Sequence, residues 1–170
     1  DQSMKYFPDR NIVQSEFENS GLFLEIISEY HGDDYFTGKV GQSQFSFSEV
    51  QAYDDDSIVF FFGLFFSVQF TNVFAGSTYI LSPLYTGTMY ELGGNLDFSR
   101  RQGAEKIILN EPEFEKVFEI YSTDTTKKKA ILTPSVMNHC LRFHRKVGYP
   151  VQFSFVGQKM YGCINFGHEL

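Results

Sequence analysis

Residues 58–70 read IVFFFGLFFSVQF, and this stretch decides the fold. In an extended chain, alternate positions from Phe60 to Phe70 carry large apolar side chains on one face, while Phe61 and Phe65 fall on the other face. Aromatic residues favour pleated sheets, so we expect a central strand with both faces covered. The run is interrupted by glycine, serine and glutamine and is shorter than the ~20 apolar residues of a membrane-spanning helix, so we do not expect it to span a membrane.

The composition is that of an acidic, aromatic-rich globular domain. A length of 170 residues suits one domain, and 42% apolar against 21% charged residues is a globular balance. The chain has 20 Phe and 10 Tyr but no Trp, which again favours sheet. We therefore expect a single soluble domain over residues 1–170, in which residues 1–20 form a peripheral helical lead-in.

The net charge and the cysteine count argue against two classes of protein. At a net charge of −7, the domain has no general electrostatic attraction for nucleic acid or for anionic lipid headgroups. We expect no nucleic-acid partner. Cys140 and Cys163 are too few for a disulfide framework, and we expect both thiols to be reduced and buried.

Strand and turn patterns surround the central stretch on its N-terminal side. Phe45 and Phe47 alternate with Ser46 and Ser48, which is typical of a half-buried strand within residues 44–53. The other expected features are a strand over 35–40, a bulge near Val50 and Ala52, and turns at His31–Asp34 and Asp54–Asp56.

Helix signals are strongest on the C-terminal side. Thr133 offers a capping hydroxyl with proline at the first helical position, and the helix should run to Val147 and stop at Gly148. The other expected features are a strand over 78–81, a long loop over Tyr85–Gly103, a short helix after Asn110–Glu113, a strand near 117–121, and a closing hairpin of 151–155 with 160–164. The fold class is therefore α+β, with a mainly antiparallel, curled sheet and the helix over about 134–147 packed on it.

One group of side chains offers the ingredients of a metal or acid–base site: His31, Asp33, Asp34 and Glu49. Their spacing matches no metal-binding loop, and Asp and Gly are the residues that turns require, so we interpret the cluster as a turn. The neighbouring Gly38-Lys39 pair lacks the hydroxyl residue that a phosphate-binding loop needs next, because Val40 follows.

The expected C-terminal helix carries a second group. His139 and His144 lie about 140° apart around the helix axis, so they do not readily share a metal ion. Cys140 and His144 can meet as a thiol–imidazole pair, but core packing of the cysteine is the simpler interpretation. The outward basic residues are interpreted as a solvated face: Arg142, Arg145 and Lys146, together with Lys127–Lys129. We assign no catalytic, cofactor-binding or metal-ligating residue.

Six segments carry a resemblance that covers most of the chain. They are SGLF (20–23), FSFSEV (45–50), FGLFF (62–66), FEKVFEIYS (114–122), LTP (132–134) and FSFV (153–156). In this order they resemble a bacterial family of unknown function, domain-of-unknown-function family 3137. The resemblance implies membrane-spanning helices before this domain, and hence a domain that faces the cytoplasm from the bacterial inner membrane. It implies no activity and no catalytic residues.

Three functional hypotheses follow, with the first preferred. The first is a non-catalytic binding or scaffolding domain of a membrane-anchored protein with a protein partner at the membrane; it predicts an exposed apolar patch or an open strand edge. The second is a hydrolase that uses His31 and nearby carboxylates, which predicts their convergence in a pocket with shifted pKa values. The third is a lipid-binding barrel, which predicts an internal apolar cavity of ~300 Å³ or more. No cofactor is expected, and the sequence specifies no small-molecule ligand.

Overall fold

The computed structural model describes residues 4–82, 102–126 and 131–167. Within these ranges the chain forms a nine-stranded antiparallel sheet and three helices, which confirms the α+β class. The strand order is β1-β2-β3-β4-β9-β8-β5-β7-β6, and the sheet is not closed into a barrel. Almost all of the loop expected over Tyr85–Gly103, and all of Lys127–Lys129, lie outside the described residues.

The elements have the following bounds. The strands are β1 (Lys5–Phe7), β2 (Glu29–Val40), β3 (Ser43–Tyr53), β4 (Val59–Gln69), β5 (Thr78–Leu81), β6 (Glu105–Ile107), β7 (Glu119–Ser122), β8 (Val151–Val156) and β9 (Lys159–Asn165). The helices are α1 (Gln14–Asn19), α4 (Pro112–Glu115) and α6 (Pro134–Val147).

The aromatic-rich stretch forms β4, which lies between β3 and β9 inside the sheet, as predicted. The Asp54–Asp56 turn that precedes it is also confirmed. The Oδ1 atom of Asp54 accepts hydrogen bonds from the backbone N–H groups of Asp56 (3.0 Å) and Ile58 (2.9 Å). This side chain closes the turn between β3 and β4 in the manner of an Asx turn.

The turn predicted at His31–Asp34 is wrong, because these residues belong to β2. Gly32 pairs with Val50 of β3, and the register shifts by one residue between Asp33 and Phe36. Asp34, at φ 52°, occupies this bulge. Bulges and turns both need residues that tolerate unusual φ angles, so the two give the same sequence signal.

The bulge predicted near Val50 and Ala52 does not interrupt β3, whose alternation runs unbroken to its end. The irregularity lies one step further, between Ala52 and Tyr53, and the extra residue is Phe60 of β4. Apolar side chains at Val50 and Ala52 continue the buried side that Ser46 and Ser48 begin.

The C-terminal helix and hairpin form as predicted. Helix α6 runs from Pro134 to Val147, the Thr133 hydroxyl accepts a hydrogen bond from the N–H of Val136, and Gly148 ends the helix at φ 74°. Strands β8 and β9 form the hairpin, with Gly157 at φ 61° in the turn. The cap, the proline and the glycine are all local signals, which explains their reliability.

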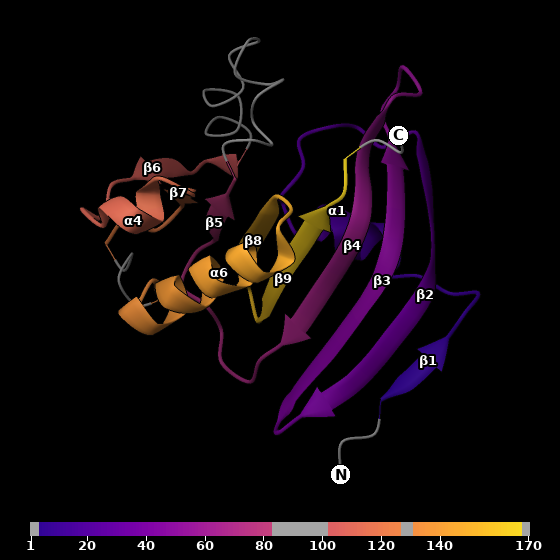
Figure 1. Cartoon of the computed structure of the whole chain (residues 1–170), viewed down its shortest axis with the longest axis horizontal. Coiled ribbons are helices and arrows are strands. Elements are labelled where there is room, and N and C mark those ends of the chain that lie inside the picture. The colour runs from indigo at the N-terminus through magenta and orange to yellow at the C-terminus, as the bar shows by residue number, and fades with distance from the viewer. Residues whose placement is uncertain (1–3, 83–101, 127–130, 168–170) are drawn as a thin grey trace.

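Figure 1 shows helix α6 in front of the sheet and helix α1 behind it. Behind, α1 packs through Phe17, which is fully buried against Phe61 and Phe65 of β4. In front, α6 packs through Met137, Cys140 and Leu141 on the part of the sheet formed by β5, β7 and β8. Among the described residues, no helix has the length and apolar character needed to cross a membrane.

Candidate functional site

One row of paired residues crosses all nine strands on the front of the sheet. Each member is the direct register partner of the next, so all the side chains share one face. In strand order the row is Tyr6, Phe36, Phe47, Phe66, Gly162, Phe153, Ile80, Ile120 and Ile107. Every position except the glycine is apolar or aromatic.

The two ends of this row have different environments. At the β6 end, Ile80 and Ile120 are almost completely buried beneath α4 and α6. At the β1 end, Phe36 and Phe47 are partly exposed and the Tyr6 side chain is 50% exposed. Figure 1 shows α6 in front of the β8–β9 side of the sheet, while no described helix lies in front of β2 and β3. The apolar row therefore continues beyond the helices that cover it.

The uncovered rings pack on one another across the strands. Tyr6 stacks on Phe36 with ring centroids 4.5 Å apart, and Phe36 stacks on Phe47 at 4.7 Å. The Tyr6 hydroxyl donates a hydrogen bond to the carboxylate of Asp34 in the bulge, and this hydrogen bond raises the pKa of Tyr6. The contact joins the short β1 strand to the aromatic row.

Two of the rings lie over glycines of the neighbouring strand. A Cβ atom added to Gly162 would lie 2.2 Å from Cζ of Phe66, and one added to Gly38 would lie 2.9 Å from Cζ of Phe45. Glycine at both positions lets the rings lie close to the backbone. We call the resulting surface the open face and define it by Tyr6, Phe36, Phe45, Phe47, Leu64, Phe66 and Val68.

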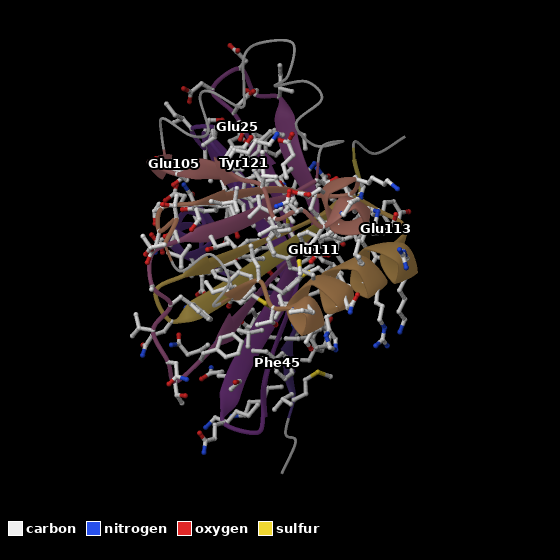
Figure 2. All side chains as sticks on the ribbon, turned by 90° about the vertical axis from the view of Figure 1, so that its left-hand side faces the viewer. Glu25, Phe45, Glu105, Glu111, Glu113 and Tyr121 are labelled. Atoms are coloured by element: carbon white, nitrogen blue, oxygen red, sulfur yellow. The ribbon has the colours of Figure 1, made fainter. Side chains whose placement is uncertain are left out.

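A groove of about 360 Å³ runs along the open face beside α6. It is lined by Phe45, Ser46, Phe47, Leu64, Phe66, Ser67, Val68, Phe143 and Ile164. Phe143 forms the wall on the side of α6, and its ring meets Phe66 edge-on at 6.1 Å. Figure 2 places Phe45 at the lower end of the sheet, apart from the four labelled glutamates. The groove is thus an apolar surface feature of the size that small apolar groups fill.

The serines of β3 explain why phenylalanine faces outward. Ser46 and Ser48 are buried at the back of the sheet, where Ser48 accepts a hydrogen bond from the N–H of Ile12 at 3.0 Å. The hydroxyls of Ser46 and Ser67 hydrogen-bond to each other at 3.0 Å, and Ser67 also donates to Glu16 of α1. Small hydroxyl side chains let the N-terminal segment approach the sheet, so the alternating phenylalanines must lie on the front.

The structure brings together three of the four residues of the proposed acid–base cluster. Asp33 pairs directly with Glu49, and His31 pairs with Gln51 on the same face, around a pocket of about 240 Å³. Asp34 is separated from them, because it lies in the bulge and binds the Tyr6 hydroxyl. The His31 ring is 62% exposed and contacts Glu29 at 3.3 Å. In the described part of the chain, no three His, Cys, Asp or Glu side chains are arranged to hold a metal ion.

The proposed thiol–imidazole pair has the environment of core residues. Cys140 and Cys163 are buried and not disulfide-bonded, as predicted. Burial raises the pKa of Cys140 to about 11 and that of Cys163 to about 12, so neither is a thiolate at neutral pH. The His144 ring packs edge-on against Phe118 at 5.8 Å, and its Nδ1 atom is buried without a hydrogen-bond partner. Such an environment does not activate a nucleophile.

Charges of opposite sign flank the groove. An exposed stripe of His139, Arg142 and Lys146 runs along α6, a helix with no acidic residue; we call it the basic stripe. Lys146 and His139 follow and precede Phe143 at helical spacing, so they lie beside the groove wall. The acidic end of the open face consists of Glu29, Asp33 and Glu49 on β2 and β3.

Sequence reasoning found the aromatic strand but missed the open face. Its members Tyr6 and Phe36, and the groove wall at Phe143, lie far apart in the chain and had no local signal. One usable signal was present: β4 carries large apolar residues on both faces, and only one C-terminal helix of suitable length was expected to cover them. A sheet with two apolar faces and one large covering helix leaves part of one face uncovered.

The comparisons with known proteins identify a family but no activity. A search of curated proteins and a search of solved structures each give no match. The model of one family, described as a protein of unknown function (DUF3137), matches residues 59–170, which include β4, α6 and the closing hairpin. The chain therefore belongs to the DUF3137 family, whose function is unknown.

Proposed function

We propose that this domain is a non-catalytic binding domain that holds a protein partner against its open face. The observation that supports the proposal is the aromatic row, which continues across β1 to β4 after the covering helices end. Contiguous exposed apolar surface on a folded domain marks an interaction site more often than it occurs without a role. Aromatic residues are also enriched among the residues that dominate binding energy.

The setting we propose is a bacterial protein tethered to the inner membrane, with this domain on the cytoplasmic side. The support is the family resemblance described above. The proposal also includes the expected curl of the sheet, since a curled sheet is concave on one face and can cradle a partner. Separation of host cells into membrane and soluble fractions, with the native full-length protein, tests the tether: recovery in the soluble fraction would contradict it.

The alternatives have less support. A lipid-binding barrel needs an enclosed cavity, whereas the described sheet is not closed and its apolar groove lies on the surface. A hydrolase needs a positioned nucleophile or a water held by a base, and the His31 cluster is a surface group in which the imidazole contacts Glu29. Nothing in the described residues indicates catalysis.

Site-specific photocrosslinking in the native host tests the proposal. A photoreactive aromatic residue replaces Phe45, which lies on the open face beside the groove. The matched control replaces Ile26, an apolar side chain that is 68% exposed and lies near α1 on the other side of the sheet. We expect a defined protein adduct from position 45 that is absent from position 26. The absence of any adduct from position 45 would overturn the proposed function.

A further inference from the structure

We propose that the partner on the open face is a second copy of this chain, related to the first by a two-fold axis through the groove. This inference rests on the proposed function, since it names the occupant of the same surface. The charges on the two sides of the groove distinguish this occupant from the others.

The open face is self-complementary in charge. On one side of the groove lies the basic stripe of α6, and on the other lies the acidic end on β2 and β3. A two-fold axis that lies in the interface, parallel to the sheet and at right angles to the line from the basic stripe to the acidic end, turns one open face onto the other and exchanges these two sides. The basic stripe of each copy then lies over the acidic end of the other, and the apolar grooves meet between them. Such an interface uses one patch twice and closes on itself.

Neighbouring contacts fix which way the helix presents its charges. Phe143 faces β4, because its ring contacts Phe66, whereas Arg145 faces α4, where its charge helps to lower the pKa of Glu113 after the dominant effect of Lys116. The basic stripe lies between these two directions on the helix surface and therefore points outward beside the groove. It is in position to meet a molecule that docks on the open face.

Other occupants would use only half of this pattern. An anionic lipid surface or an acidic peptide would attract the basic stripe but would be repelled by Glu29, Asp33 and Glu49 on the same face. A second copy places charges of opposite sign against both sides at once. The net charge of −7 on each copy opposes association at long range, but salt screens charges beyond ~8 Å at physiological ionic strength. The charge pairs at the interface lie closer together than this distance, so they decide whether the two copies associate.

Paired charge reversals test the proposal in the purified chain by light scattering after size exclusion. In one variant R142E and K146E reverse the basic stripe, and in the other E29K and D33K reverse the acidic end. Each variant alone places like charges opposite each other at both contacts, so we expect at least a tenfold weaker homodimer. Mixed together, they place opposite charges at both contacts, and we expect a heterodimer of wild-type affinity.

The E18K/E105K variant is the matched control, because it makes the same change in net charge as E29K/D33K at two exposed positions, on α1 behind the sheet and on β6 at its other end. We expect it to dimerise like the wild type. A monomeric wild-type chain, or a dimer that ignores both reversals, would overturn the inference. Crosslinking at position 45 then distinguishes the homodimer from the proposed function. An adduct with a different protein supports the proposed function and contradicts the homodimer, whereas the absence of any adduct contradicts both.

Discussion

Phe66 lies across Gly162 of the neighbouring strand, so that a Cβ atom at position 162 would lie 2.2 Å from Cζ of the phenylalanine. The two residues are direct register partners at the point where the covered and uncovered parts of the aromatic row meet. The glycine thus positions the ring that joins the core beneath α6 to the open face.

The first prediction is that Gly162→Ala lowers the free energy of unfolding by ~1–3 kcal/mol, the usual cost of forcing extra volume into a packed site. The added methyl group must push the Phe66 ring toward the groove. F66L shortens the side chain and should recover part of the loss in the double variant. Gly63→Ala is the contrasting control, because its Cβ would meet backbone and not a side chain: it would lie 1.9 Å from the backbone oxygen of Ile164. Urea unfolding measures all four chains, and additive losses for F66L and G162A would contradict the relationship.

The second prediction concerns the ion pair that holds α1 to the sheet. The carboxylate of Glu16 accepts hydrogen bonds from Lys159 at 2.7 Å and from Ser67 at 2.8 Å, and both members of the ion pair are largely shielded from solvent. We expect a double-mutant cycle of E16A and K159A to give a coupling energy of ~1–2 kcal/mol, above that of exposed pairs. The same cycle on Glu113 and Lys116, whose side chains are 75% and 68% exposed, should give a clearly smaller coupling energy, because solvent screens exposed charges. Equal couplings would mean that shielding adds nothing to the first pair.

The third prediction separates the open face from the core. Phe65 is fully buried, and Phe65→Ala should cost ~3–5 kcal/mol of stability. Phe45 is only partly buried, so Phe45→Ala should cost ~1 kcal/mol, because most of the loss scales with the area removed from water. We expect F45A to remain folded, which denaturation measures. We expect it to lose association with its partner, which light scattering measures. Unchanged association of F45A would argue against the open face as the binding surface.

The fourth prediction concerns the thiols. Burial raises the pKa values of Cys140 and Cys163 to about 11 and about 12, from the ordinary thiol value of 9.0. Since folding disfavours each thiolate, the stability that these groups contribute is fully present below pH 9 and is lost as the pH rises through the folded-state values. Thiol labelling at pH 8 should therefore be slow in the native chain and fast in urea. Rapid labelling of either thiol in the native chain would show that its site opens readily.

The fifth prediction tests the start of α6. The Thr133 hydroxyl accepts the hydrogen bond from the N–H of Val136, and Thr133→Ala should cost ~0.5–2 kcal/mol. Thr133→Ser keeps the hydroxyl and should retain most of the stability. Thermal unfolding of the two variants measures the difference, and an equal loss in both would assign the effect to the methyl group instead.

Local signals were sufficient for the parts of the fold that they specify. Thr133, Pro134 and Gly148 predict the limits of α6, because capping geometry depends on a few adjacent residues. The closing hairpin and the turn at Asp54 were predicted for the same reason. By contrast, β1 and β6 have three residues each, too few to show an alternating pattern, and they form only because a longer strand lies beside them.

The open face could not be predicted, because which side of a strand is buried depends on distant residues. The Phe-Ser alternation of β3 predicts a half-buried strand and is correct in that respect. Its serine side is buried because the N-terminal segment, more than thirty residues away, supplies Ile12 as the hydrogen-bond partner of Ser48. The His31 cluster was similarly predicted as a turn, since its place in β2 depends on pairing with β3.

The position of β9 between β4 and β8 also determines when the sheet can be completed during synthesis. Strand β4 ends at Gln69, but its partner begins at Lys159, so one edge of the phenylalanine-rich strand has no neighbour until the ribosome has made the last strand. At ~5–20 residues per second, this wait lasts roughly 5–20 s. During that time β4 presents unpaired backbone groups and aromatic side chains, which are the features that promote aggregation. The nascent chain should therefore depend on chaperones until β9 emerges.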